Sequence, residues 1–320
     1  MPKYTKATAL AKGTVYSPPF DALYIGSGNY TETTTAGSVA TPSIWYSSND
    51  QGIGTYSGMS SSRWDDRGAT GDHGATTGTS YQASGGPNGY SYYNFDTNTD
   101  YITVNDSTTF NIGTGEFEMM AVVKFVDNGN VYQHIAARDK SANNWAWYRA
   151  SDAAGSNPGK IVFSIAGTDP VSATTPAYDT WYIVGVARDS GNNVQIYLNG
   201  STDGSSVSNS ADLDSDDDDN LIIGGRYTGT AYNQSLLGHM TEFILWESEL
   251  SDANRASIVQ ILQDKYINAP QANIINLDRD GTAGTFKQLS VGKLYEIEST
   301  GIQTGSTAVS YTHLRAHETV

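Results

Sequence analysis

The chain of 320 residues contains no cysteine, which excludes disulfide bonds and thiolate metal sites. It has no apolar run near the about 20 residues that a membrane-spanning helix needs, and no continuous apolar segment of a signal peptide stands near its start. Basic residues are scarce, with 18 Lys and Arg against 34 Asp and Glu, giving a net charge of −16. Binding of a phosphate backbone relies on clustered Lys and Arg. We therefore expect neither a nucleic-acid partner nor membrane insertion.

Gly, Ser, Thr, Asn and Asp are abundant instead, and Tyr is the commonest aromatic residue, with 21 copies against 8 Phe and 6 Trp. Long stretches of Leu, Ala, Glu and Lys, which are typical of helices, are nearly missing. This composition favours many short strands joined by turns.

The apolar pattern from Ser43 to Ile267 supports that expectation. In "GEFEMMAVVKFVD" one face carries Phe117, Met119, Ala121, Val123 and Phe125, while Glu118 and Lys124 fall on the other, as in a half-buried strand. "NVQIYLNGS" ends in Asn199-Gly200, the strongest short hairpin signal. About a dozen such strands predict an all-β, antiparallel two-sheet jelly-roll sandwich. One helix is expected after Ser251, which can cap it, with an apolar stripe of Ile258, Ile261 and Leu262.

The domain organisation follows from these patterns. Residues 1–42 are interpreted as an N-terminal arm or small β element, 43–267 as the sandwich, and 268–308 as the start of a further β module. Residues 309–320 are "VSYTHLRAHETV". This stretch reads as the in-frame translation of a sequencing adapter and is excluded from fold reasoning.

The stretch "RWDDRGATGDHG", Arg63 to Gly74, packs three aspartates and a histidine among glycines. One interpretation is a structural turn, in which glycines give tight bends and aspartates accept backbone N–H bonds; its residues are Trp64, Asp65, Asp66, Gly68 and Gly71. The alternative is a metal site built from Asp65, Asp66, Asp72 and His73, although the Asp-x-Asp-x-Asp-Gly spacing of calcium loops is missing.

Six stretches in order resemble laminin-G-like, concanavalin A-like lectin domains, which are related to pentraxins and are common in viral and environmental bacterial proteins. The stretches are "SIWYSSND", "RWDDRGATGDHGAT", "YYNFDTNTDYITV", "VQIYLNGS", "LIIGGR" and "LGHMTEFILWESELSDANRASIVQILQDKY". The resemblance covers about two thirds of the chain. It implies a concanavalin A-like sandwich that recognises carbohydrate, in which the Trp64–Asp66 turn links the first strand to the sheet edge.

The resemblance to pentraxins also implies a calcium site on one sheet face, with Asn143, Asn144 and Gln234 at ligand positions. The acidic ligands expected after "LIIGG" are replaced here by Arg226, Tyr227 and Thr228. A second candidate for Ca²⁺ is the run "ADLDSDDDDN", with Asp214, Asp216 and Asp217. The same run also reads as a solvated loop that protects a sheet edge.

Sugar binding requires an aromatic face flanked by polar side chains. Trp145 and Trp147 share one face of a strand while Asn144 and Tyr148 share the other, and one of these sets belongs to the core. The loop "RYTGTAYNQS" adds further aromatic and amide groups. The candidate carbohydrate-binding residues are therefore Trp145, Tyr148, Tyr227, Tyr232, Asn233 and Gln234.

Signs of catalysis are few. A retaining glycosidase needs two carboxylates about 5–5.5 Å apart, and the nearest strand pattern, Glu116-x-Glu118, has Met120 at its third position. Nucleophile-elbow and phosphate-loop motifs are missing. His134 and His239 are interpreted as core histidines satisfied by neighbours, and Glu242 as a partly buried carboxylate held by backbone donors. We therefore predict a protein that is not an enzyme.

The predicted function is recognition or decoration on a phage or virus particle, with host-surface glycan and other virion proteins as partners. The alternatives are a bacterial cell-surface adhesion protein and a glycoside hydrolase of the same fold. The expected location is the virion or, under the first alternative, the cell surface. A homo-oligomer stays open, although no coiled-coil heptads occur.

Overall fold

The computed structural model describes residues 41–48, 62–105, 112–127, 132–138, 145–166, 168–213, 220–227 and 231–268, and the backbone of four short strands further along. The chain divides into two units. One comprises Ala22–Ile267, and the other combines Met1–Asp21 with Asn268–Val320. Each unit is described by itself.

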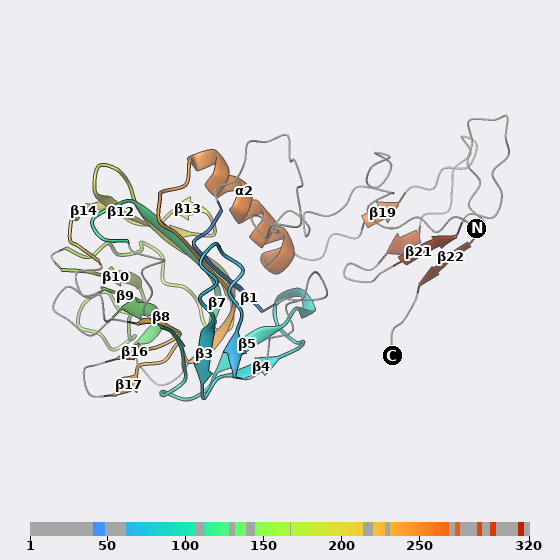
Figure 1. The fold of residues 1–320 in the computed structure, drawn as a ribbon, viewed down its shortest axis with the longest axis horizontal. Helices are drawn as coiled ribbons and strands as arrows, with labels where there is room; N and C mark the ends of the chain where they lie inside the picture. Colours follow the sequence, from blue (N-terminus) through green and yellow to red (C-terminus); the bar gives the residue numbers. More distant parts are fainter. Residues whose placement is uncertain are drawn as a thin grey trace. The chain divides into compact units, whose positions relative to one another are not determined.

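The first unit contains two antiparallel sheets (Figure 1). Sheet A has nine strands among the described residues, and its main path runs β13-β12-β11-β7-β18-β5-β4, with β1 paired to β18 and β14 to β12. Their bounds are β1 (Ile44–Ser47), β4 (Ser80–Gln82), β5 (Tyr92–Phe95), β7 (Phe117–Phe125), β11 (Trp181–Arg188), β12 (Asn193–Leu198), β13 (Ser201–Thr202), β14 (Val207–Ser208) and β18 (Gly238–Trp246).

Sheet B has seven strands in the described part of the chain, in the order β10-β9-β8-β15-β6-β3-β2. Their bounds are β2 (Arg63–Trp64), β3 (Gly74–Thr77), β6 (Tyr101–Val104), β8 (Gln133–Arg138), β9 (Trp145–Arg149), β10 (Ile161–Ser164) and β15 (Leu221–Ile223). A small hairpin, β16 (Arg226–Tyr227) with β17 (Tyr232–Asn233), follows β15 and contacts β8. A short 3-10 turn, η2 (Pro87–Gly89), precedes β5.

The main hydrophobic core lies between the two sheets. The alternation predicted for β7 is confirmed, since Phe117, Met119, Ala121, Val123 and Phe125 all belong to this core. Strands of sheet B contribute their own alternate residues from the facing side. The predicted Asn199-Gly200 turn is also present. Both residues have positive φ, 50° and 86°, and they join β12 to β13.

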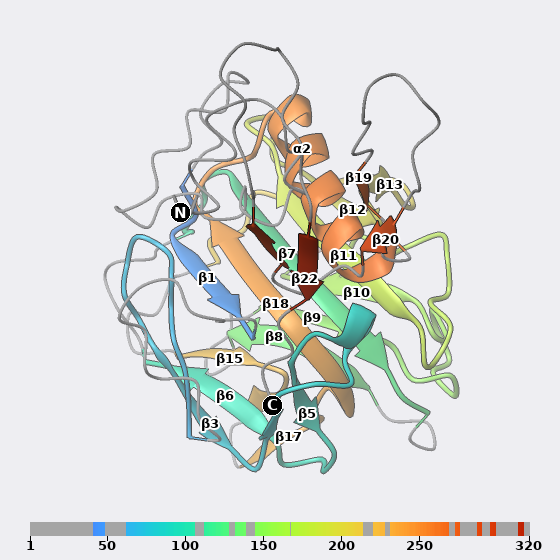
Figure 2. The same ribbon diagram turned by 90° about the vertical axis from the view of Figure 1, so that its right-hand side faces the viewer.

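A second core covers the opposite face of sheet A. The predicted helix is α2 (Asp252–Leu262), continued by the π-helical turn η3 (Gln263–Ile267), and it lies over β7, β11 and β18 (Figure 2). The Ser251 hydroxyl caps it by accepting a bond from the Asn254 N–H at 3.3 Å. The outer face of the sheet meets it with Met120, Val122, Ile183, Ile244 and Trp246, while the helix side supplies Ile258, Val259, Leu262 and Tyr266.

This helix corrects one expectation. Strand β7 is not half-buried, because eight of its nine residues are buried on one face or the other. Alternation reports the parity of side chains but not what covers the outer face. No helix in the described segments is long and apolar enough to cross a membrane.

The second unit contains two short hairpins. Strand β19 (Asn273–Ile275) pairs with β20 (Lys287–Leu289), and β21 (Tyr295–Glu298) pairs with β22 (His313–Ala316). The last strand falls in the segment predicted to be adapter translation. That interpretation, and the division into 1–42, 43–267, 268–308 and 309–320, stays a prediction.

Candidate functional site

The face of sheet B that points away from sheet A carries a group of tyrosines. On β9, Trp145 and Trp147 point into the core. Tyr148, the next residue along the strand, therefore points outward. On β6, Ile102 and Val104 point inward, and Tyr101 therefore points outward. The β16–β17 hairpin adds two further tyrosines, Tyr227 and Tyr232. We call this group the tyrosine face; its members are Tyr101, Tyr132, Tyr148, Tyr227 and Tyr232.

Ring contacts link the tyrosines at each end. Tyr132, exposed at 37 %, meets Tyr148 edge-on with a centroid distance of 5.5 Å. At the other end Tyr232 stacks on Tyr101 at 4.1 Å and contacts Tyr227 at 4.9 Å. Burial raises the pKa of the Tyr148 phenol, so its hydroxyl stays protonated and can donate a hydrogen bond at physiological pH.

His134 and Arg226 lie between these two ends. The His134 ring is 5.0 Å from the Tyr148 ring. Its Nδ1 is 3.0 Å from the Gln234 carbonyl, which can only accept, so Nδ1 carries the proton and Nε2 is the bare acceptor. Burial, reinforced by the charge of Arg226, lowers the pKa of His134 to about 3. The imidazole is therefore neutral at physiological pH.

His134 also departs from its predicted role. It was expected to be satisfied by neighbours, but its buried Nε2 has no hydrogen-bond partner among the described residues. The same holds for the buried Nδ1 of His239 within those ranges. Buried polar atoms without partners are uncommon in folded proteins.

Among the predicted carbohydrate-binding residues, Tyr227 and Tyr232 contact each other at one end of the tyrosine face, and Tyr148 lies at its other end. Gln234 lies beside them and contributes its backbone carbonyl to His134, and Asn233 pairs through its backbone with Arg226. The placement of Trp145 is corrected. Its side chain is 1 % exposed in the core between the sheets, and its ring lies 5.5 Å from that of Phe163.

Sequence reasoning missed two members of the tyrosine face, Tyr101 and Tyr132. The alternation of "YITV" carried a signal for Tyr101, since Ile102 and Val104 mark the inward face of that strand. Tyr132 stands just before β8, outside any alternating run, and only its ring contact with Tyr148 identifies it.

Most of the predicted calcium ligands lie in parts of the chain that the structure does not describe. Residues Asn143, Asn144, Asp214, Asp216 and Asp217 lie outside the described residues. Gln234 is described, in a left-handed backbone conformation with φ of 53°. Within the described ranges no three His, Asp or Glu side chains gather as a metal site would require. Calcium binding stays a prediction.

The Arg63–Gly74 stretch is organised around Asp66. This carboxylate accepts two bonds on Oδ1 and three on Oδ2, at 2.8 to 3.1 Å, from Trp45 N, Gly68 N, Thr70 Oγ1, Gly71 N and Asp72 N. Burial raises the pKa of the Asp66 carboxyl, and these donors oppose the shift. A carboxylate whose lone pairs are occupied by the backbone closes a turn, and here it joins the turn after β2 of sheet B to β1 of sheet A.

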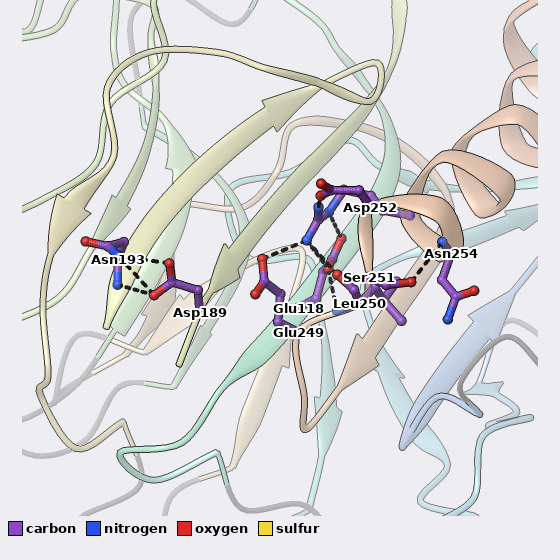
Figure 3. A network of polar contacts seen from close by, with 9 residues as sticks. Glu118, Asp189, Asn193, Glu249, Leu250, Ser251, Asp252 and Asn254 are labelled. Atoms are coloured by element: carbon purple, nitrogen blue, oxygen red, sulfur yellow. Dashed lines mark hydrogen bonds and ion pairs between the residues drawn. The ribbon is translucent and has the colours of Figure 1, made fainter. Parts of the chain in front are cut away.

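Glu118, the acid of the nearest glycosidase-like pattern, lies beneath α2 and does not face a cleft. Its two oxygens bond Arg255 Nε and Nη2 at 2.8 and 2.9 Å, and Oε2 also accepts from the Leu250 N–H at 3.0 Å (Figure 3). Burial raises the pKa of Glu118, opposed by the Arg255 bonds and charge. Figure 3 also shows Glu249 and Asp252 converging on the same guanidinium.

Glu242 on β18 differs from its predicted role. It is fully buried and held by side chains, where backbone donors were expected. The donors are Trp45 Nε1 at 2.9 Å, Ser47 Oγ at 2.7 Å, Lys265 Nζ at 3.0 Å and the Tyr266 hydroxyl. Burial lowers the pKa of Lys265, and the charge of Glu242 opposes that shift.

The two buried glutamates lie on neighbouring strands of sheet A. Glu118 stands opposite Trp246, and Glu242 stands opposite Val122, four residues along the same strand pair. At about 3.3 Å per residue their backbones are about 13 Å apart.

Two antiparallel sheets with a helix over the outer face of one of them define a concanavalin A-like sandwich. A laminin-G-type family model described as "Concanavalin A-like lectin/glucanases superfamily" matches residues 96–254, just under half of the chain. The comparison with curated proteins found no match.

Solved structures of similar fold come from toxins and a sialidase. The binding domain of Paraclostridial Mosquitocidal Protein 1 gives a TM-score of 0.51 at 12 % identity, over 73 % of this chain and 53 % of that one. A Trypanosoma rangeli sialidase in complex with sialic acid gives 0.51 at 13 %, over 81 % and 39 %. The chain therefore spans about half or less of these proteins, and at such identities the likeness is one of fold.

Proposed function

We propose that the sandwich is a non-enzymatic recognition domain that binds glycan through the tyrosine face. The observation that carries the proposal is a pair of ring clusters on the tyrosine face. Tyr132 contacts Tyr148 in one cluster, and Tyr232 contacts Tyr101 and Tyr227 in the other. Tyrosine offers an apolar ring for the C–H face of a pyranose and a hydroxyl for its polar edge. The similarity in fold to the binding domain of the mosquitocidal toxin supports a binding role.

The carboxylates support binding without cleavage. Glu118 and Glu242 are both committed to buried contacts with cations and hydrogen-bond donors, and a catalytic acid must reach the glycosidic oxygen. The sialidase fold similarity favours a hydrolase as the second candidate. Release of reducing sugar from a polysaccharide panel would support that candidate over ours.

We further propose that this domain is carried on a phage or virus particle, contacting host-surface glycan and other virion proteins. Support comes from the flanks, where "PPFDALYIGSGNYTE" and "LSVGKLYEIEST" loosely resemble segments of phage structural proteins. A bacterial surface adhesion protein is the alternative. Capsid and tail genes beside the full-length gene would support the virion, and a cell-wall sorting signal would support the alternative.

The test is a glycan array probed with the full chain, with and without a calcium chelator. We expect binding to at least one glycan, and a drop of about tenfold or more in affinity for Tyr148→Ala and Tyr232→Ala, because each removes a ring worth more than about 1.4 kcal/mol at a contact centre. Loss of binding with chelator would in addition support a calcium-dependent site.

Matched variants separate stacking from hydrogen bonding. Tyr148→Phe and Tyr232→Phe keep the rings and are expected to retain most of the affinity, while Tyr81→Phe on sheet A serves as a distant control. Absence of binding to any glycan in both conditions contradicts the proposal. Unchanged binding by both alanine variants, with native circular dichroism, contradicts the assignment to the tyrosine face.

A further inference from the structure

One tryptophan differs from all the others in exposure. All six tryptophans lie within the described residues, and five of them, Trp45, Trp64, Trp145, Trp147 and Trp246, are at most 2 % exposed. Trp181, the first residue of β11, is partly exposed. It lies on sheet A, whereas the tyrosine face belongs to sheet B. A surface tryptophan next to polar groups is a common anchor of binding sites.

Trp181 belongs to a row of residues across four strands. It pairs with Lys124 on β7, Lys124 pairs with His239 on β18, and His239 pairs with Asn94 on β5. Their neighbours Val123, Met240 and Tyr93 point into the core between the sheets, so the row points to the outer face. At about 4.8 Å per strand the row is about 14 Å long.

Aromatic contacts hold the row together. The Tyr92 ring, two residues before Asn94 on the same face of β5, lies 4.5 Å from the His239 ring and 6.3 Å from the Trp181 ring. His239 and Trp181 are 6.0 Å apart, and Lys124 Nζ lies 5.8 Å over the Trp181 ring. We call these five residues the Trp181 surface. The residues two positions along, Val122 and Ile183, lie in the core beneath α2, so the Trp181 surface borders the helix-covered area.

Two polar groups of the Trp181 surface, on His239 and Lys124, are not used in hydrogen bonds or ion pairs with the described residues. Burial, together with Lys124, lowers the pKa of His239 to about 4, with Asp179 opposing, so the ring is neutral at physiological pH. Its Nδ1 is buried and has no hydrogen-bond partner in the described segments. Within the same segments Lys124 forms no ion pair, and its ammonium offers three donors.

We propose that the Trp181 surface is a second binding site, independent of the tyrosine face, for a neutral oligosaccharide. The rings of Trp181 and Tyr92 would stack on the C–H faces of sugar rings, with the His239 ring packed against both of them, and Lys124 and Asn94 would bond the hydroxyls. Charge selects a neutral ligand. Two carboxylates border the row, since the charge of Asp179 acts on His239 and Asp96 accepts a bond from Asn94, and the net charge of −16 repels polyanions. Sites on both sheets would let one domain engage two glycan chains.

The test uses tryptophan fluorescence. Because five tryptophans are buried, a charged quencher such as caesium ion reaches Trp181 alone. We expect a neutral oligosaccharide from a panel of malto-, cello-, manno- and galacto-oligosaccharides to lower the quenching constant at least twofold. Sialyllactose and oligogalacturonate should not. Trp181→Phe should abolish quenching in the absence of any sugar.

Calorimetry with the protecting sugar identifies the residues. Lys124→Gln and Asn94→Ala alter surface groups and should each weaken binding severalfold with unchanged thermal unfolding, whereas Tyr148→Ala on the tyrosine face should leave Trp181 protection unchanged. No protection by any neutral sugar, protection by acidic sugars only, or full affinity in both surface variants overturns the proposal. Unchanged glycan-array binding by Tyr148→Ala and Tyr232→Ala would contradict the assignment of the first site to the tyrosine face, and it would leave the Trp181 surface unaffected.

Discussion

Glu118 on β7 and Arg255 in α2 form a two-pronged ion pair between helix and sheet, although 137 residues separate them in the chain. Both are nearly fully buried, with side chains 1 % and 5 % exposed. Burial alone would lower the pKa of Arg255, but its bonds and charge interaction with Glu118 raise it. Arg255 also donates to the Leu250 carbonyl at 3.1 Å. The pair therefore fixes the chain just before α2 as well as the helix.

Replacing Arg255 by Met is expected to destabilise the fold by about 3–5 kcal/mol, because a buried carboxylate is left without its partner. The double variant Glu118→Met/Arg255→Met should recover most of that loss, since both charges are gone. Urea unfolding measures the difference. Asp252→Ala, which removes an exposed contact of the same arginine, is the control and should change little. Equal losses in the single and double variants would contradict this account.

The fold was predictable because period-2 alternation, an Asn-Gly turn and a capped helix all agree on a sandwich. Alternation could not show which face of each strand is covered by the other sheet or by the helix. Trp145 and Tyr148 are both aromatic and lie on opposite faces of one strand, so the sequence left open which of them faces the core. Glu118 has the parity of an outward residue, and only the distant α2 makes its position buried.

The candidate site was less predictable for a local reason. Strand β8 contains a bulge between His134 and Ala136, where the register with β9 shifts. Ile135 and Ala136 consequently both reach the core, and His134 turns outward to Tyr148. A bulge changes side-chain parity without a mark in the apolar pattern. The contact of Tyr101 with Tyr232 likewise joins segments more than a hundred residues apart, which no local pattern reports.

Asp66→Asn is predicted to be destabilising despite its similar shape. The amide keeps one acceptor oxygen and turns an NH₂ group toward the donors of the other, so at least two backbone N–H groups lose their acceptor. Each such group costs about 1–3 kcal/mol, and we expect a total of about 2–5 kcal/mol. Thermal and urea unfolding measure it. Asp96→Asn on an exposed turn is the control, and an equal effect of both substitutions would refute the role of Asp66.

His134 should make stability depend on pH. Its pKa is about 3 in the folded state against about 6.5 when unfolded, so the unfolded chain binds the extra proton. Its stabilising contribution is full above the unfolded pKa and is lost as pH falls from about 6.5 toward 3. At about pH 5.0 the loss relative to pH 7.5 is about 2 kcal/mol.

The measurement is urea unfolding of the native chain and of His134→Gln at those two pH values. The glutamine can donate to the Gln234 carbonyl but does not titrate, so its stability should fall by about 2 kcal/mol less on acidification. His239 and the carboxylates titrate in both proteins and cancel in the difference. An identical pH dependence would show that His134 is solvated or already charged in the folded chain.

Gly224→Ala tests how the β16–β17 hairpin is held against the sandwich. Gly224 has φ of +71°, and a Cβ there would lie 2.1 Å from Phe95 Cε1. Backbone strain of about 1–2 kcal/mol adds to overpacking of about 1–3 kcal/mol. Gly71→Ala is a matched control, because φ is +74° and nothing lies within 4 Å of its Cβ. The control should therefore show the backbone strain alone.

The same substitution should reach the tyrosine face. The Gly224 N–H donates to the Ile135 carbonyl at 2.8 Å, and its own carbonyl accepts from Leu236 N and Ser235 Oγ. A shift of Gly224 therefore moves the chain that enters β16 and the chain that leaves β17. We expect Gly224→Ala to weaken glycan binding together with stability, while Gly71→Ala leaves binding unchanged. Equal losses of unfolding free energy in the two variants would show that the Phe95 ring moves aside without destabilising the fold.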